Sequence, residues 1–228
     1  MSIQISPSLM CMDFLHIQSE IENLSNIADE FHVDILDYHY CKNLSLTPPI
    51  MKQIASITNI PIDAHLYMDP IDLELIEWCI ECGAKIITLP IDVIQRQAFA
   101  IKRLLAQNNV QFGLFLNPSD SIYSLEPFLP ILDRILILSV DPGFAGQTFI
   151  PSTIERIEKL VQIRKETKSH FTISIDGCCN EKHYKALYQA GADLFIVGGS
   201  GLFNKDKNTK KAIEIMKDHL QKETGVKL

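Results

Sequence analysis

Two short apolar segments each place a histidine and an aspartate two residues apart, a spacing that suits metal binding. These are His32 with Asp34, and Asp63 with His65; Asp176 ends a third apolar segment. Residues i and i+2 of a β-strand point to the same face, so each pair projects together. The set His32, Asp34, His65 and Asp176 predicts one divalent metal ion, Zn²⁺ first, with Mn²⁺, Fe²⁺, Co²⁺ and Mg²⁺ as alternatives. A simple hydrogen-bonded His–Asp pair is the competing interpretation.

Two glycine-rich segments have the composition of a phosphate site. Asp141–Gln147 contains Gly143 and Gly146, and Gly198–Gly201 contains three glycines in four residues. Glycine lets the backbone approach an anion, and successive amides can hold phosphate without a lysine. Ordinary strand-to-helix turns also favour glycine, so this alternative stays open.

The elements that must position these residues follow an alternating pattern. Short apolar runs and longer amphipathic segments alternate about eight times. This alternation predicts parallel strands with helical crossovers, and the polar residues fall at several strand ends. We therefore expect an α/β protein, a (β/α)8 TIM barrel formed by residues 1–228 as a single domain, with an open doubly wound sheet as the alternative. The predicted strands are Ile3–Ser8, Phe31–Ile35, Ile62–Leu66, Ile86–Leu89, Gln111–Leu116, Ile135–Val140, Thr172–Asp176 and Leu194–Val197.

Composition narrows the class of function. The formal net charge of −7 argues against nucleic-acid binding, which requires a basic face. No apolar run approaches the roughly 18 residues that span a bilayer, and the N-terminus lacks the pattern of a signal peptide. Six cysteines are too few for a disulfide scaffold in 228 residues, so we expect a cytoplasmic protein.

One cysteine pair needs separate consideration. Cys79-x-x-Cys82 has the spacing of half a zinc site or of a redox pair, but it lies in a predicted helix that ends at Gly83. We interpret it as part of a helix face packed on the barrel.

Several sequence motifs resemble those of the ribulose-phosphate 3-epimerase family. They occur in the same order along the chain and are spread over almost the whole sequence. Met10–Asp13, Cys179-Asn180 and Ser200–Asn204 favour the branch that acts on allulose 6-phosphate. The matching phrases are Ile5–Asp13, Phe31–Ile35, Asp63–Leu66, Val140–Gln147, Ile175–Gly177 and Val197–Asn204.

The resemblance implies epimerisation at C3 of a ketose phosphate, either D-allulose 6-phosphate or D-ribulose 5-phosphate. It also implies a ribulose-phosphate-binding type of barrel, a sugar phosphate as small-molecule partner and a homo-oligomer. Asp34 and Asp176 would be the acid/base pair, and Ser8 would contact the substrate. The implied phosphate ligands are Gly177, Gly199 and Ser200, closed over by the loop of Gly143 and Gly146.

The chain departs from the family at several places around the predicted site. Tyr38 replaces a glycine, so if that glycine has positive φ, either Tyr38 adopts an uncommon conformation or the loop is rebuilt. Leu36, Tyr67 and Leu138 stand at positions where relatives carry methionine, and Tyr67 adds a hydroxyl that we expect to bind substrate. Leu89-Pro90 stands where relatives often carry a histidine.

These departures suggest an altered substrate preference or rate. They also leave open a non-catalytic sugar-phosphate binder that kept the fold. A hexulose-phosphate synthase or decarboxylase is a further alternative, but no lysine accompanies the carboxylates on their strands.

Overall fold

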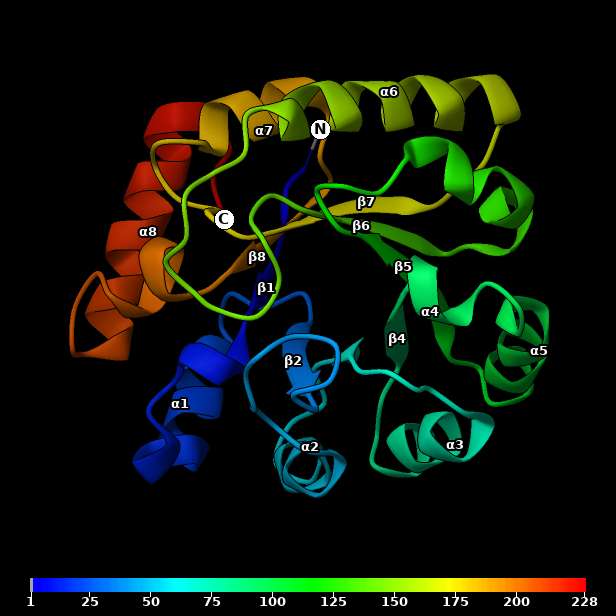
Figure 1. The fold of residues 1–228 in the computed structure, drawn as a ribbon. Coiled ribbons are helices and arrows are strands. Elements are labelled where there is room, and N and C mark those ends of the chain that lie inside the picture. Colours follow the sequence, from blue (N-terminus) through cyan, green and yellow to red (C-terminus); the bar gives the residue numbers. More distant parts are fainter. Residues whose placement is uncertain (1) are drawn as a thin grey trace.

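A computed structural model describes residues 2–228, which form a barrel of eight parallel strands surrounded by helices (Figure 1). Neighbouring strands follow the order β1-β8-β7-β6-β5-β4-β3-β2, so each strand lies beside its neighbours in the sequence. The strands are β1 (Gln4–Pro7), β2 (Phe31–Leu36), β3 (Ile62–Tyr67), β4 (Ile86–Pro90), β5 (Gln111–Leu116), β6 (Arg134–Leu138), β7 (Thr172–Asp176) and β8 (Leu194–Val197). The (β/α)8 prediction is confirmed.

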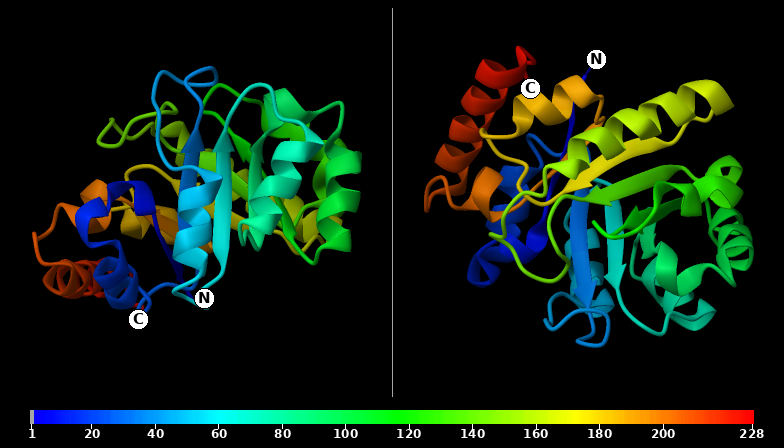
Figure 2. Two further views of the ribbon diagram at one scale, coloured as in Figure 1. Left: turned by 90° about the horizontal axis from the view of Figure 1, so that it is seen from below. Right: turned by 45° about the horizontal axis from the view of Figure 1, so that its top comes forward.

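The seam of the barrel lies between β1 and β2. These strands end the hydrogen-bonded order, and a parallel bridge between Ser8 and His32 links them. The two views of Figure 2 show the helices around the outside of the strands. The loops that carry the predicted phosphate-binding residues follow the C-terminal ends of the strands.

Local sequence explains where several helices begin and end. Asp72 and Asn208 cap α3 and α8 by accepting hydrogen bonds from backbone N–H groups in the first turn. Gly191 and Gly225 end α7 and α8 in the left-handed conformation. The helices are α1 (Ile17–Leu24), α2 (Pro48–Ala55), α3 (Leu73–Glu81), α4 (Ile91–Ile94), α5 (Ala98–Gln107), α6 (Ser152–Thr167), α7 (Tyr184–Ala190) and α8 (Thr209–Thr224).

The connection between β5 and β6 departs from the regular alternation. It is a 3₁₀ segment, Ile122–Ile131, that contains Pro127 and Pro130. Proline removes a backbone donor and clashes with the preceding turn, which disfavours an α-helix there. Shorter helical turns are Leu9–Cys11, Phe14–His16 and Gly199–Phe203.

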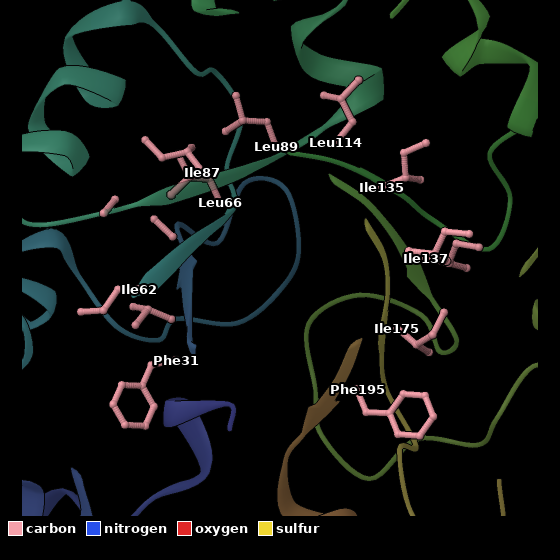
Figure 3. Packing of buried hydrophobic residues seen from close by; sticks show 14 of the residues in the cluster. Phe31, Ile62, Leu66, Ile87, Leu89, Leu114, Ile135, Ile137, Ile175 and Phe195 are labelled. Carbon is pink, nitrogen blue, oxygen red and sulfur yellow. The ribbon is translucent and has the colours of Figure 1, made fainter. Parts of the chain in front are cut away.

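Alternate residues of each strand face two different environments. One set packs with the helices in a continuous apolar layer, part of which Figure 3 shows around the strands. The other set lines the interior, where a small apolar cluster includes Leu36, Tyr67, Phe115, Leu136 and Leu138. Deeper interior positions carry polar side chains instead, and these build the site.

Cys79 and Cys82 behave as the helix interpretation predicted. Both are buried, and Cys79 lies on the face of α3 that packs in the apolar layer. All six cysteines are free thiols in the described residues. Among residues 2–228, no helix has the length and apolarity required to cross a membrane.

Candidate active site

Four predicted ligands converge at the C-terminal end of the barrel. His32 and Asp34 come from β2, His65 from β3, and Asp176 is the last residue of β7. One ligand atom from each of the four lies within 4.8 Å of the others. The register pairs Asp34 with His65, so the histidine–aspartate pair of β2 lies beside that of β3. The cluster could hold a metal ion.

The distances support that fit. His32 Nε2 and His65 Nδ1 face each other at 2.8 Å, and Asp34 Oδ1 lies 3.1 Å and 3.3 Å from these two nitrogens. Asp176 Oδ2 completes the group at 4.0 Å and 3.9 Å. Two imidazole nitrogens and two carboxylate oxygens around one point form a donor set suited to a divalent transition metal or zinc.

Burial and mutual charge shift the pKa values in opposite directions. Burial alone would raise the pKa of Asp34, but the charge of His32 and hydrogen bonds from both histidines lower it. For Asp176, burial and the nearby charge of Asp34 raise the pKa. Burial acts to lower the pKa of His32, yet Asp34 and Asp63 hold it well above its ordinary value. The two carboxylates therefore occupy different electrostatic environments.

Two hydroxyl groups hold the carboxylates. The Ser8 hydroxyl donates to Asp34 Oδ2 at 2.8 Å, and the Tyr67 hydroxyl donates to Asp176 Oδ2 at 3.1 Å. The Tyr67 ring also lies 4.2 Å from the His65 ring and 5.0 Å from that of Phe115, centroid to centroid. Tyr67 thus lines the site with its hydroxyl directed at a carboxylate.

A pocket opens above the cluster and contains almost all of the predicted site residues. His32 and His65 are fully buried behind it. Its lining includes Ser8, Asp34, Tyr67, Gly143, Gly146, Asp176, Gly177, Gly199 and Ser200.

Backbone geometry explains two of the glycines. Gly177 has a φ of 96°, and a Cβ there would come within 2.7 Å of Val140 Cγ2. Gly201, directly after the lining residues, would place a Cβ 2.0 Å from the carbonyl oxygen of Cys179. Gly199 and Ser200 begin the short helical turn, where the first amides lack partners within the turn. The Asn180 side chain donates to the Ser200 hydroxyl at 3.0 Å.

The loop Asp141–Gln147 borders the pocket and is tied down at several points. Asn43 Nδ2 donates to the Gly143 carbonyl at 2.6 Å, and the Cys178 thiol donates to the Gln147 carbonyl at 3.0 Å. Gln147 closes the loop on itself through the Asp141 and Phe144 carbonyls. In Figure 2 this loop lies at the end of the barrel where the strands end.

The departures from the family pattern have visible consequences. Tyr38 has a φ of 70°, so it takes the uncommon conformation that the replaced glycine predicted. Leu36, Tyr67 and Leu138 keep an apolar wall beside the site. Pro90 is buried as the last residue of β4.

Sequence reasoning named Asp63 beside His65 but gave it no role, and it missed the polar partners of Asp63 below the ligands. Asp63 Oδ2 lies 3.2 Å from His32 Nδ1, and Asp63 is held in turn by Thr88 and by Arg134, which pairs with Glu30. The available signals were the shared face of Asp63 and His65 and a lone arginine before an apolar run. The predicted strand started at Ile135, whereas β6 starts at Arg134 and ends at Leu138 rather than Val140.

Curated proteins are similar to this chain over nearly its whole length. A curated ribulose-phosphate 3-epimerase of Helicobacter pylori is 32% identical over 212 residues, covering 93% of this chain and 95% of the relative. One from Escherichia coli is 31% identical over 220 residues and covers 96% of each chain.

Two solved structures share the fold at low sequence identity. KGPDC of Streptococcus mutans, solved as a complex, has a TM-score of 0.74 at 14% identity, over 97% of this chain and 98% of that one. A mutant tryptophan synthase alpha-subunit of Pyrococcus furiosus has a TM-score of 0.69 at 14% identity, over 99% and 98%. The model of the ribulose-phosphate 3 epimerase family matches residues 4–203. The chain therefore belongs to this family, and it is an isomerase.

Proposed function

We propose that this enzyme catalyses metal-dependent epimerisation at C3 of a ketose phosphate through an enediolate. The observation that carries the proposal is the placement of two carboxylates from different sides of the barrel. Asp34 on β2 and Asp176 on β7 belong to one cluster and line one pocket. Inversion at carbon requires a base on one face and an acid on the other, which two opposed carboxylates can supply.

Each carboxylate has a distinct task in this scheme. One of Asp34 and Asp176 removes the C3 proton, and the other returns a proton to the opposite face. Ser8 holds Asp34 and Tyr67 holds Asp176, so each carboxylate keeps its orientation toward the sugar. Leu36 lines the pocket and belongs to one buried apolar cluster with Leu138, so we expect this apolar wall to shield the reacting carbon from water.

His32, Asp34, His65 and Asp176 would hold one divalent metal ion, with Zn²⁺ as our first choice. When bound, the ion would stabilise negative charge on the substrate oxygens as the proton leaves C3. Both histidines are fully buried, so their imidazoles are held in place by the barrel interior.

The phosphate group would be bound by Gly177, Gly199 and Ser200, with Gly143 and Gly146 on the loop above. In the described residues, the lining of the pocket contains no lysine or arginine. Backbone amides and the start of the short helical turn are therefore the anion ligands that we propose.

We propose D-allulose 6-phosphate as the substrate, with D-ribulose 5-phosphate as the alternative. Support for the six-carbon sugar comes from Met10–Asp13, Cys179-Asn180 and Ser200–Asn204. The curated relatives are named for the five-carbon reaction. The test is metal-dependent exchange of the C3 proton with solvent deuterium, measured by NMR for both sugars. Exchange with neither sugar in metal-loaded protein would refute the proposal.

A second candidate is a sugar-phosphate binder without turnover. Tyr67 favours it, because its hydroxyl already occupies Asp176 Oδ2. Calorimetry would then detect binding of both sugars by metal-loaded protein that gives no exchange. A lyase or decarboxylase of the same fold is disfavoured, since the described residues that line the pocket include no lysine.

Three wider expectations accompany the proposal. We propose that residues 1–228 act as a single domain and that the enzyme assembles as a homo-oligomer. The free cysteines are consistent with the reducing cytoplasm as its site of action.

A further inference from the structure

A chain of buried charged side chains crosses the barrel below the metal cluster. It runs from Glu30, just before β2, through Arg134 on β6 and Asp63 on β3 to His32. Glu30 is 6% exposed, Arg134 3%, and Asp63 and His32 are fully buried. In the strand order β2 and β6 lie on opposite sides of the ring, so Arg134 spans the interior.

Asp63 is held in one orientation from two sides. The Thr88 hydroxyl donates to Asp63 Oδ1 at 2.8 Å, and Arg134 Nη1 donates to Asp63 Oδ2 at 3.0 Å. Oδ2 is also the atom that lies 3.2 Å from His32 Nδ1. Among the described residues Nδ1 of His32 has no hydrogen bond of good geometry, and Asp63 Oδ2 is the carboxylate oxygen beside it, while Nε2 faces Asp34, His65 and Asp176. A proton on Nδ1, on the side of Asp63, leaves the Nε2 lone pair free for a metal ion.

Arg134 is itself oriented by Glu30. Nη1 and Nη2 donate to the two carboxylate oxygens of Glu30, which is a bidentate pairing. The planar guanidinium can make this fork and still reach Asp63 with Nη1, which an ammonium group cannot do. The Glu30 fork therefore fixes the direction in which Arg134 meets Asp63.

Stability alone does not explain such a network. Removing several charges from water costs free energy, and well-packed apolar residues of similar volume often stabilise a core as well or better. The barrel interior already uses apolar residues such as Leu136 and Leu194. A charged chain that ends on a ligand histidine has a more direct explanation in orientation of that histidine.

We propose that Arg134, anchored by Glu30, is a positioning residue that sets the metal affinity of the site through Asp63 and His32. The inference rests on the metal centre of the proposed function. It assigns a role in metal binding to Arg134 and Glu30. These two residues contact neither substrate nor metal, and they lie at the opposite end of the barrel interior.

The test is Co²⁺ binding to the full chain, measured by competition with a chromogenic chelator and by the visible absorption spectrum. Arg134→Met and the double variant Glu30→Gln/Arg134→Met should weaken binding by about ten- to a hundredfold and alter the spectrum. Arg134→Lys should restore part of the affinity, and Glu30→Gln should give a smaller loss. The double variant leaves no unpaired Glu30 and serves if Arg134→Met alone does not fold.

Arg164→Met is the matched control, because Arg164 forms an ion pair with Asp193 away from the cluster. It should lower the unfolding temperature while leaving the Co²⁺ dissociation constant and spectrum unchanged. Wild-type affinity and spectrum in the folded double variant would overturn the inference and leave the metal centre standing. Failure of the wild-type protein to bind Co²⁺ would overturn the metal centre and, with it, the inference.

Discussion

At the residue scale, the two carboxylates of the site differ in their partners. Asp34 accepts from Ser8 and faces both histidines, whereas Asp176 accepts from Tyr67 and is partly open to the pocket. A two-base mechanism makes a specific prediction from this asymmetry, since each carboxylate would serve one face of C3.

We predict that Asp176→Asn strongly slows conversion between epimers while the protein still folds. Exchange of the C3 proton should persist, at a lower rate, for the epimer whose proton faces Asp34. The rate of epimerisation should fall by about 10²–10⁴, the usual contribution of a general acid or base. Separate NMR measurement of exchange and of conversion checks this, and Asp34→Asn should show the opposite selectivity. Unchanged conversion in either variant contradicts the assignment.

Tyr67→Phe separates two roles of the tyrosine. The change removes the bond to Asp176 and keeps the ring against His65 and Phe115. If the hydroxyl positions Asp176, kcat should fall about tenfold or more with little change in KM, since hydrogen bonds to charged groups contribute about 1.5–3 kcal/mol. A raised KM with unchanged kcat would instead assign the hydroxyl to substrate binding. Tyr123→Phe, at an exposed position, is the control.

At the element scale, the short turn Gly199–Phe203 packs against the segment that follows β7. We predict that Gly201→Ala lowers the free energy of unfolding by about 1–3 kcal/mol, because its Cβ would meet the backbone oxygen of Cys179 at 2.0 Å. The turn must shift to relieve this contact, so KM for the sugar phosphate should rise. Denaturant unfolding and steady-state kinetics measure the two effects.

Gly225→Ala is the matched control for that substitution. Gly225 has a φ of 76° with no atom within 4 Å of an added Cβ, so the cost is conformational. It should lower stability by about 1 kcal/mol without altering KM. Equal KM values in the Gly201 and Gly225 variants would show that the turn does not contribute to phosphate binding.

The sequence predicted the bounds of the strands more accurately than the side-chain contacts inside the barrel. Alternating segments predicted the strands to within two residues at either end, since hydrophobic periodicity is a local signal. Arg134 lies outside the predicted strand because it stands beside Asp133, just before the apolar run, where a charged pair indicates a loop. Its partners Glu30 and Asp63 lie 104 and 71 residues away in the chain, and only the closed barrel brings the three together.

The four-residue cluster was predictable because the ligands on β2 and β3 alternate with apolar residues, so they share the interior face, and Asp176 ends β7. The bond from Tyr67 to Asp176 was not predictable, because it joins residues 109 positions apart. The spacing of residues in the sequence therefore predicted which strands carry the ligands. It could not predict which carboxylate the Tyr67 hydroxyl contacts, because that depends on the directions of side chains across the barrel.

At the scale of the whole molecule, the barrel closes at a narrow seam. The described strands β1 and β2 meet through the Ser8–His32 bridge, reinforced by the Ser8–Asp34 hydrogen bond. The ligand cluster joins β2 and β3 on one side of this seam to β7 on the other, across β1 and β8. A bound metal ion would therefore brace the barrel where its backbone pairing is weakest.

We predict that metal removal lowers the unfolding temperature by about 5–10 °C relative to protein with metal at a hundredfold excess over its dissociation constant. Such binding contributes about 2.7 kcal/mol, and each kcal/mol shifts the midpoint of a chain of this size by about 2–4 °C. Calorimetry of chelator-treated and reloaded protein measures the shift. Hydrogen exchange should show β1 and β2 opening faster in metal-free protein, with β4 and β5 little changed, because the seam loses its brace. Uniform acceleration across all strands would mean that the metal stabilises the fold without acting at the seam.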